Sequence, residues 1–444
     1  MKEYPYWWDT VPGSFGSPTP DPRPSAAGSA SSDSSAPADS SLPARVDVAI
    51  VGAGYTGLAA ARQLARAGAT VLVCERGDTG WGASSRNGGQ VLTGLRLDAA
   101  TLVSRYGEAG ARALFDIANE SMSALERIVA DEGIACDLHR SGHVLAACKP
   151  SHFAALRDEQ ALLARVFDHR VELVSRGEQR AEIGTDAYHG LLVDEHSLAI
   201  NPARYVLGLA DAARRAGVTV SAHTTVERVE RRGSRWTVTT SNGTSDAGDL
   251  LVATNGYASA AFPPLRRRFV PVGSYIVATE PLAEADAARV LPKGRMAFDS
   301  KYFLYYFRMT ADRRLLFGGR AEFSLPEPTA TGRAARILHD GLRRLFPELA
   351  NTAIDYAWGG NVAFTRDEMP RAGRLEQAYY AGGYGGHGVA LATHLGTLIA
   401  RRMAGEPIDH PLFDDRFAPI PLYYGTPWFL PAVGAYYKAK DWLS

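Results

Sequence analysis

Two short apolar runs, residues 46–51 and 70–75, flank a segment of helical spacing at 57–67. Continuous apolar runs of roughly four to eight residues are typical of strands that are buried on both faces of a parallel sheet. A helix between two such strands forms a strand–helix–strand unit within about 30 residues. We therefore predict a parallel sheet close to the N-terminal end of the chain.

The pattern continues as a mixture of helices and strands. Apolar residues at helical spacing predict helices at 99–131, 203–216, 331–346 and about 388–403. Apolar or alternating runs predict strands at 218–220, 224–230, 236–240, 250–253, 302–309, 314–319 and 379–382. The combination predicts an α/β fold, α+β overall.

Composition indicates a folded globular chain. Of its 444 residues, 46% are hydrophobic and 22% are charged, which leaves ample apolar mass for a core. Glycine contributes 44 residues, above its usual share of about 7%, and no collagen repeat accompanies it. The surplus needs a local explanation, because glycine serves where the backbone turns tightly or approaches something closely.

Charge and cysteine content exclude several classes of protein. Lys plus Arg and Asp plus Glu both number 48, so the chain lacks the basic excess of a nucleic-acid binder. The cysteines Cys74, Cys136 and Cys148 lie far apart without metal-ligand spacing, and a reducing compartment suits them. The sequence shows neither a membrane-spanning apolar run nor a secretory signal. We expect a cytoplasmic protein with no metal, no nucleic-acid partner and no membrane span.

The first 44 residues fall into two parts of different composition. Residues 1–16 contain the aromatic cluster Tyr4, Tyr6, Trp7 and Trp8, which we expect to dock on the body of the protein. Residues 25–42 are rich in Ser, Ala and Asp and lack aromatic, β-branched and basic residues. Such a stretch cannot bury enough apolar surface to offset the entropy of ordering. We interpret 17–44 as a flexible linker.

A glycine-rich turn follows the first expected strand. Gly52, Gly54 and Gly57 fit G-x-G-x-x-G between a strand and a helix, and Glu75 ends the next strand. In this context the glycines allow a tight turn, close approach of a pyrophosphate and close helix packing. The helix N-terminus attracts phosphate, and Glu75 can accept hydrogen bonds from a ribose. The alternative is a tight turn without a ligand, which Glu75 and the next loop disfavour.

A second polar loop, 81–90, comes directly after the second expected strand. Arg86 can neutralise a pyrophosphate there, and Gly88 and Gly89 allow close approach to a ring. A loop of this kind suits a cofactor larger than NAD, and so it favours FAD. A surface turn would explain the glycines but not Arg86 and Asn87.

These motifs resemble the D-amino-acid-oxidase-like superfamily of FAD oxidoreductases. The stretch 52–90 carries that resemblance. The stretches 305–320, 383–389 and 423–431, together with Tyr6 and Trp7, resemble gamma-glutamylputrescine oxidase-like proteins within it. The resemblance covers nearly the whole chain except the linker.

The resemblance implies a discontinuous Rossmann-like FAD-binding domain and a substrate domain with a mixed or antiparallel sheet. The FAD-binding domain would comprise 45–98, 193–260 and 355–420, the substrate domain 99–192 and 261–354, and a C-terminal extension 421–444. A backbone group of Val226 would contact the adenine. The residues implied to bind FAD are Gly52, Gly54, Tyr55, Thr56, Gly57, Glu75, Arg76, Gly82, Ala83, Ser84, Arg86, Asn87, Gly88, Gly89, Gln90, Val226, Thr254, Asn255, Gly256, Gly360, Gly383, Tyr384, Gly386, His387, Gly388 and Val389.

The chemistry that the resemblance implies is hydride transfer from an amine-bearing carbon to flavin N5. An aromatic wall favours it, because desolvation keeps the amine neutral. At the period of a strand, Tyr302, Tyr306 and Arg308 share a face, where Arg308 would bind a substrate carboxylate. Alternatively, these tyrosines are core residues and Arg308 is a surface charge. His387 would assist the flavin at its pyrimidine edge, or else it only caps a helix.

Two features of related oxidases are missing. Sarcosine-oxidase-like members attach FAD to a cysteine in the segment that corresponds to 358–364, which here contains none; we therefore expect non-covalent FAD. They also place a lysine over the flavin for the reaction with O2, but 315–318 has none and Lys301 is the nearest.

Three functions remain open on this evidence. The first and favoured one is an amine or amino-acid oxidase that makes an imine, hydrolysed afterwards, and H2O2. The second is a flavin dehydrogenase with a carrier as electron acceptor, and the third is a non-catalytic flavin-binding assembly protein.

Overall fold

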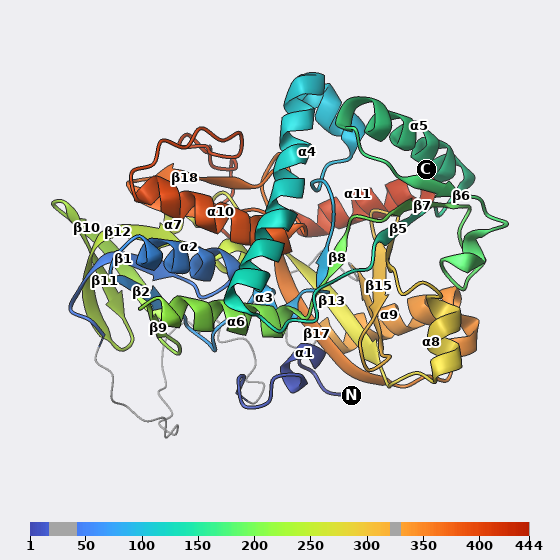
Figure 1. The fold of residues 1–444 in the computed structure, drawn as a ribbon, viewed down its shortest axis with the longest axis horizontal. Coiled ribbons are helices and arrows are strands. Elements are labelled where there is room, and N and C mark those ends of the chain that lie inside the picture. Colours follow the sequence, from blue (N-terminus) through green and yellow to red (C-terminus); the bar gives the residue numbers. More distant parts are fainter. Residues whose placement is uncertain (17–41, 320–329, 444) are drawn as a thin grey trace.

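Two large sheets form the body of the protein, the first at the left and the second at the right of Figure 1. The computed structural model describes residues 1–16, 42–319 and 330–443. Most of the expected linker, residues 17–41, lies outside the described residues, as does Arg320 at the end of one of the motifs.

The first sheet contains the strand–helix–strand unit that the sequence predicts. β1 (Arg45–Val51) pairs in parallel with β2 (Val71–Cys74) and with β12 (Gly243–Val252), and α2 (Tyr55–Arg66) joins β1 to β2. Val71 and Val73 of β2 belong to one hydrophobic cluster and Leu72 and Cys74 to another, so both faces of the sheet are buried. The remaining strands are β9 (Thr219–Ser221), β10 (Val226–Arg232), β11 (Arg235–Thr240), β18 (Arg371–Leu375) and β19 (Ala378–Gly382).

Five helices contribute residues to the cluster that covers one face of this sheet. They are α2, α4 (Ala99–Glu132), α5 (Pro150–Phe167), α6 (Pro202–Arg215) and α10 (Gly388–Met403). A Cβ at Gly396 of α10 would lie 2.4 Å from the carbonyl oxygen of Thr56 in α2, so the two helices approach each other at a distance that only glycine permits. The long helix α4 changes direction at Gly107, whose φ is 70°.

The second sheet is mixed, as expected for the substrate domain. Only β14 and β5 pair in parallel; the other neighbours are antiparallel. One face packs on α9 (Ala330–Leu345), where Leu338 and Leu342 meet Phe307 and Phe317. In spatial order its strands are β17 (Ile354–Phe364), β13 (Val270–Thr279), β16 (Leu315–Gly319), β15 (Tyr305–Met309), β14 (Met296–Asp299), β5 (His143–Ala146), β7 (Leu191–Asp194) and β6 (Glu172–Val174).

Smaller elements complete the described chain. A three-stranded sheet contains β3 (Gln90–Val91), β8 (Leu198–Ala199) and β4 (His139–Arg140). The other α-helices are α1 (Tyr6–Asp9), α3 (Ala83–Arg86), α7 (Pro263–Arg266), α8 (Glu284–Val290) and α11 (Leu430–Leu443).

The structure confirms the expected fold class, and most predicted elements lie within a few residues of their predicted bounds. The strand predicted at 302–309 is wrong at its start, because β15 begins at Tyr305. The backbone N–H groups of Tyr302 and Phe303 donate to the carboxylate of Asp441 at 2.8 and 2.9 Å instead of to a neighbouring strand. All strands of the first sheet fall within 45–98, 193–260 and 355–420, whereas β17 starts at the edge of the third range and pairs into the second sheet.

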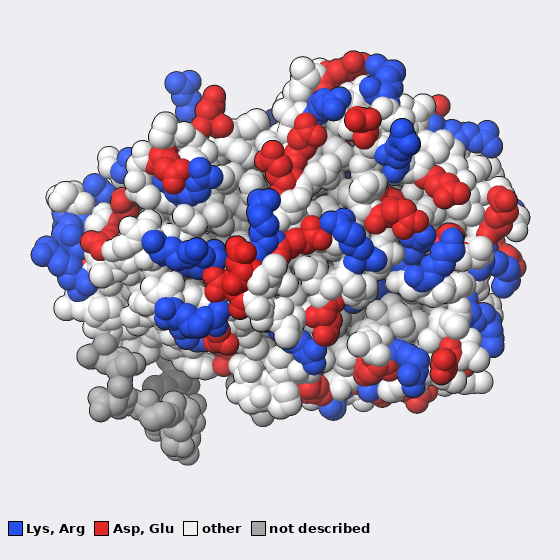
Figure 2. All heavy atoms as spheres, viewed as in Figure 1, with Lys and Arg blue, Asp and Glu red and all other residues white. Residues whose placement is uncertain are grey.

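The surface carries both signs of charge in close mixture. On the face shown in Figure 2, Lys and Arg side chains are interspersed with Asp and Glu, and neither sign forms a broad field. Within the described part of the chain, no helix combines the length and apolar character needed to cross a bilayer.

Candidate cofactor and substrate site

A cavity of about 1000 Å³ lies between the two large sheets, and residues of both sheets line it. Its walls include the start of α2, the loop 81–90 and the turn before α10 on one side, and strands β13, β15, β14, β5 and β7 on the other. This volume is at the upper end of the range for ligand pockets, about 300–1000 Å³. It is large enough for an extended cofactor together with a substrate.

The turn from β1 into α2 forms one end of the cavity. Gly52 has a φ of 106°, in the region that favours glycine, and a Cβ at Gly57 would lie 2.0 Å from the Gly52 carbonyl oxygen. The N-cap of α2 is Gly54, which supplies no side-chain cap, and the first turn of the helix contains no acid. The backbone N–H groups and the positive end of the helix dipole are therefore directed to an anion at this end.

Glu75 lies on the cavity wall beside this turn. Its carboxylate accepts hydrogen bonds from the backbone N–H of Ala53 at 2.8 Å and of Gly77 at 3.2 Å. These two bonds hold the acid next to the glycine-rich turn, as the nucleotide-binding interpretation requires.

Arg86 fastens the loop 81–90 to the second sheet. Its guanidinium lies between the rings of Trp8 and Trp81, at 4.9 and 4.4 Å from their centroids. It donates hydrogen bonds to the carbonyl oxygens of Trp81 at 2.9 Å and of Gly359 in β17 at 3.1 Å. These two hydrogen bonds from Arg86 therefore help to order the loop 81–90.

The aromatic N-terminal segment packs directly on this loop. The indole N–H of Trp8 donates to Ser85 Oγ at 3.0 Å, and that of Trp7 donates to the Asn87 carbonyl oxygen at 2.9 Å. Trp7 and Trp8 are both buried. Residues at the start of the sequence therefore support the loop from the side opposite the cavity.

Three distant segments meet at the turn before α10. Asn255, after β12, accepts a hydrogen bond at Oδ1 from the backbone N–H of Gly383 at 2.9 Å. The hydroxyl groups of Tyr384 and Thr56, the latter in α2, lie 2.6 Å apart. His387 is the N-cap of α10 and provides no side-chain cap hydrogen bond. The positive end of this helix dipole therefore faces the cavity.

Most of the residues expected to bind FAD line this one cavity, although they come from five separate stretches of sequence. Four of the expected glycines do not line it. A Cβ at Gly89 would lie 2.2 Å from the Ile200 carbonyl oxygen, so Gly89 permits packing behind the wall. The four are Gly57, Gly89, Gly256 and Gly383.

Tyr306 lines the cavity, but Arg308 does not. The guanidinium of Arg308 is buried and donates to the carbonyl oxygens of Gly89 at 2.7 Å and of Ile200 at 2.9 Å. The ring of Trp7 lies 5.6 Å from it. Burial lowers the pKa of Arg308 to about 10. The expected role in binding a carboxylate is therefore wrong, and so is the alternative of a surface charge: Arg308 bridges segments inside the protein.

A row of side chains crosses the second sheet on the cavity side. Tyr306, Phe298, Leu145 and Leu192 are direct cross-strand neighbours on β15, β14, β5 and β7, and all four line the cavity. A Cβ at Gly318 would lie 2.2 Å from the Tyr306 ring, so this glycine makes room for the ring. The wall is thus aromatic at one end and aliphatic at the other.

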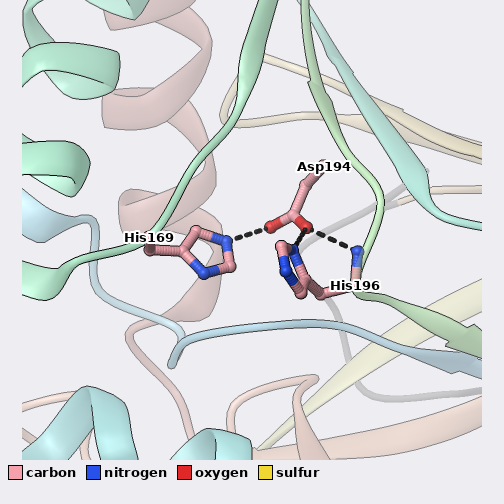
Figure 3. Close-up of side chains that lie close together, drawn as sticks. All are labelled: His169, Asp194 and His196. Atoms are coloured by element: carbon pink, nitrogen blue, oxygen red, sulfur yellow. Dashed lines mark hydrogen bonds and ion pairs between the residues drawn. The ribbon is translucent and has the colours of Figure 1, made fainter.

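Beyond this row lies a polar cluster that the sequence did not reveal, which we call the distal cluster: His143, His169 and Asp194. His169 and His196 both point toward the Asp194 carboxylate (Figure 3), with Nε2 of His169 2.7 Å from Oδ2 and Nδ1 of His196 3.0 Å from Oδ1, and the two rings are neighbours with centroids 4.7 Å apart. Burial alone would raise the pKa of Asp194, but the hydrogen bond from His169, the electrostatic influence of His143 and His169 and the hydrogen bond from Thr93 together outweigh burial and hold the pKa below its usual value. Burial lowers the pKa of His143 to about 4.

Lys301 also lies on the cavity wall, paired with a buried acid. Its ammonium is 2.9 Å from Asp299 Oδ2 and 3.8 Å from the centroid of the Tyr305 ring. Burial raises the pKa of Asp299 to about 6, and Lys301 partly opposes this shift. Asp299 and Lys301 are only two residues apart, although no sequence motif surrounds them. The residues of the distal cluster are far apart along the chain, so only the fold brings them together.

The residues around the cavity fit FAD. Glycines form a cradle at the start of α2 and before α10, where side chains would obstruct a flat cofactor. The uncapped start of α2 and the carboxylate of Glu75 beside it supply the donors and the acceptor that the pyrophosphate and a ribose of FAD require.

Comparison with known proteins agrees with this geometry. The family model described as "FAD dependent oxidoreductase" (DAO) matches residues 47–402. The chain is 35% identical over 405 residues to gamma-glutamylputrescine oxidoreductase of Escherichia coli (strain K12), covering 89% of this chain and 93% of that protein. It is 31% identical over 386 residues to the probable oxidoreductase OrdL of Haemophilus influenzae, covering 85% and 87%.

Solved structures share the fold at lower identity. The glycine oxidase from Geobacillus kaustophilus has a TM-score of 0.72 at 20% identity and covers 85% of this chain and 99% of its own. The L-proline dehydrogenase from P. horikoshii has a TM-score of 0.68 at 20% identity and covers 84% and 96%. These likenesses extend over both sheets and therefore support the two-sheet architecture.

Proposed function

The chain belongs to the FAD dependent oxidoreductase (DAO) family, in its gamma-glutamylputrescine oxidoreductase-like subgroup, and from this premise we propose that it oxidises a C–N bond of an amine or amino-acid-like substrate. When bound, FAD would supply the hydride acceptor, N5, and we propose O2 as the final electron acceptor, which would be reduced to H2O2. The imine product is released to hydrolysis. The observation that carries the proposal is that the glycine cradle and the aromatic wall open into one cavity.

Different segments of the glycine cradle would bind different parts of FAD. The start of α2 would hold the pyrophosphate, because its N–H groups and dipole are free of a side-chain cap. Glu75 would accept a hydrogen bond from a ribose, and Val226, on the cavity wall, would contact the adenine. Gly360, Gly386 and their neighbours, also on the wall, would hold the ring system. No cysteine occurs in 358–364, so we propose that FAD is held without a covalent bond.

The aromatic wall prepares the substrate. Tyr306 and Phe298 exclude water from the end of the cavity where the reaction takes place. Loss of water disfavours the charged ammonium form of the substrate and increases the fraction of neutral amine, which is the form that gives up hydride. Opposite them, the N-terminus of α10, with His387, stabilises negative charge that develops on the reduced cofactor. We propose Tyr306 and His387 as the residues that act at the reaction centre.

The two sheets correspond to two functional parts in this proposal. The FAD-binding part comprises 45–98, 193–260 and 355–420, and the substrate part comprises 99–192 and 261–354. Support comes from the strands of the first sheet, all of which lie in the first set of ranges. β17, which pairs with the second sheet, forms a shared wall.

An anaerobic flavin-reduction screen tests the proposal. The panel comprises gamma-glutamyl amines, polyamines, N-methyl amino acids and D-amino acids, and we expect at least one class to bleach the flavin. Gamma-glutamyl amines are the first choice because of the 35% identity to gamma-glutamylputrescine oxidoreductase. If none reduces the flavin, the non-catalytic alternative holds.

Exposure of the reduced protein to air identifies the electron acceptor. Rapid reoxidation with formation of peroxide supports an oxidase. Flavin that stays reduced in air-saturated buffer but is reoxidised by a quinone or another carrier would show a dehydrogenase instead.

A further inference from the structure

The distal cluster has two imidazole nitrogens that nothing in the described protein engages. His143 uses Nδ1 on Ser197 Oγ at 2.8 Å, and His169 uses Nε2 on Asp194. Within the described residues, Nε2 of His143 and Nδ1 of His169 form no hydrogen bond. Neither nitrogen is completely enclosed by surrounding protein atoms. Both side chains are more than nine-tenths buried and line the cavity. These two nitrogens are therefore directed into the cavity.

The chemistry of His169 is fixed by its partner. The ionised Asp194 carboxylate can only accept, so Nε2 of His169 carries a proton, and in the neutral ring Nδ1 is then the nitrogen with the lone pair. Among the described residues, four groups contact the carboxylate: Thr93 Oγ1 and His169 Nε2 donate to Oδ2, and the backbone N–H and ring Nδ1 of His196 face Oδ1. Asp194 is thus a positioning residue whose charge acts through His169.

The cluster lies far from the reacting end of the cavity. Tyr306 and Leu192 are separated by three steps across neighbouring strands, and each step is about 4.8 Å, which gives about 14 Å. His143 and Asp194 lie two residues further along β5 and β7. A span of about 14 Å equals roughly four residues of extended backbone. A substrate the size of a simple amino acid at Tyr306 cannot reach this cluster.

We propose that the distal cluster binds a second, cationic nitrogen of the substrate, so that the protein prefers elongated amines with an ammonium group at the end remote from the oxidised carbon. This inference rests on the proposed function, because it assigns the remote end of the same cavity. The lone pair of His169 accepts from the ammonium, and the Asp194 charge behind it strengthens that bond.

The distal cluster and His196 together also offer metal-ligand atoms, since those of His169, Asp194 and His196 lie within 4.8 Å of one another. The arrangement favours the ammonium. His169 Nε2 and His196 Nδ1 both hydrogen-bond the Asp194 carboxylate, so these nitrogens are already occupied. The other ring nitrogen of His169, Nδ1, points away from Asp194 (Figure 3) and could not share a metal ion with it.

The test compares two ligands and four proteins, all as FAD-loaded full chains. The ligands are a long α,ω-diamine and the amino alcohol of the same length, which lacks the second charge. The variants are His169→Gln, which keeps a donor for Asp194 but removes the ring acceptor, and Asp194→Asn. His196→Gln is the matched control, because His196 bonds the same carboxylate but does not line the cavity.

Anaerobic calorimetry gives the dissociation constant of each ligand, and rapid mixing gives the rate of flavin reduction. Wild type and His196→Gln should bind the diamine about tenfold to a hundredfold more tightly than the amino alcohol, the usual value of a charged hydrogen bond. His169→Gln should lose this preference while keeping its affinity for the amino alcohol. Asp194→Asn should weaken it.

The outcomes separate this inference from the proposed function. A preference that persists in His169→Gln, no preference in wild type, or a stoichiometric metal ion in the purified protein would overturn the cation site. Preferential binding of the diamine without flavin reduction by any amine would overturn the proposed function and leave the site in place. Should Asp194→Asn fail to fold, the comparison of His169→Gln with His196→Gln decides the question.

Discussion

Replacing Trp8 by alanine should weaken FAD binding although Trp8 does not line the cavity. The side chain is 6% exposed, its indole N–H donates to Ser85 Oγ at 3.0 Å, and its ring lies 4.9 Å from the Arg86 guanidinium. Both contacts end on the loop 81–90, one wall of the proposed FAD cradle. The substitution should therefore disorder the loop 81–90 by removing its support on the side opposite the cavity.

The size of the effect follows from the lost contacts. A hydrogen bond contributes about 0.5–1.5 kcal/mol, and a cation–π contact contributes about 0.5–2 kcal/mol according to its exposure. If ordering the loop is required for FAD, a loss of about 1.5–3 kcal/mol raises the dissociation constant about tenfold to a hundredfold. Trp8→Phe keeps a ring to stack on Phe15, at 4.8 Å in the wild type, but loses the donor; its effect should be severalfold.

Fluorescence titration of the apoprotein with FAD measures this constant directly. Trp428→Ala is the control, because Trp428 is 68% exposed and its removal should leave the constant unchanged. Thermal unfolding of the apoproteins separates global destabilisation, for which truncation of a buried Trp costs about 3–5 kcal/mol, from the effect on binding. Trp8→Ala protein that remains folded and binds FAD within twofold of wild type would refute the reasoning.

Three further outcomes follow. Gly57→Ala should abolish FAD binding or folding, because the new Cβ would lie 2.0 Å from the Gly52 carbonyl oxygen; spectra and cofactor content of the purified variant check this. Arg308→Leu should lower the free energy of unfolding, because it removes the hydrogen-bond donor of buried carbonyl groups at a cost of about 1–3 kcal/mol each. It should raise the KM values of carboxylate-bearing amines and of simple amines alike. A KM increase confined to carboxylate-bearing substrates would instead support a role of Arg308 in binding the carboxylate. Burial lowers the pKa of His143 from 6.5 to about 4, so the ring stays neutral in the fold while the unfolded chain already takes up a proton. As the pH falls from 6.5 to 4, the free energy of unfolding should therefore decrease by about 3 kcal/mol more in wild type than in His143→Gln. Equal pH dependence of the two proteins in denaturant titrations would contradict this.

The nucleotide end of the site is predictable from sequence because its chemistry is local. Gly52, Gly54 and Gly57 lie within one turn, and both flanking elements are visible as an apolar strand and a helical pattern. Glu75 follows directly after the next strand. The turn before α10 is similar, since its glycines form one short run.

The substrate end is not predictable in this way because its residues meet only through the second sheet. His143, His169 and Asp194 come from separate stretches that share no spacing. The pairing of β5 with β7 places His143 beside Asp194, and the segment after α5 brings His169 to the same carboxylate. Arg308 shows the opposite limit. Strand periodicity places it near Tyr306, but it cannot show that the carbonyl groups of Gly89 and Ile200 take up its donors. The strand expected at 302–304 is wrong for a related reason, since Asp441 at the far end of the chain takes the backbone donors.

The most direct test of the central claim is the rate of anaerobic flavin reduction by an amine and by the same amine deuterated at the carbon to be oxidised. If hydride passes from that carbon to the flavin in the cavity between the sheets, the amine bleaches the flavin and deuteration slows the reduction severalfold. A flavin that no amine reduces, or one whose slow bleaching is indifferent to deuterium, would contradict the account.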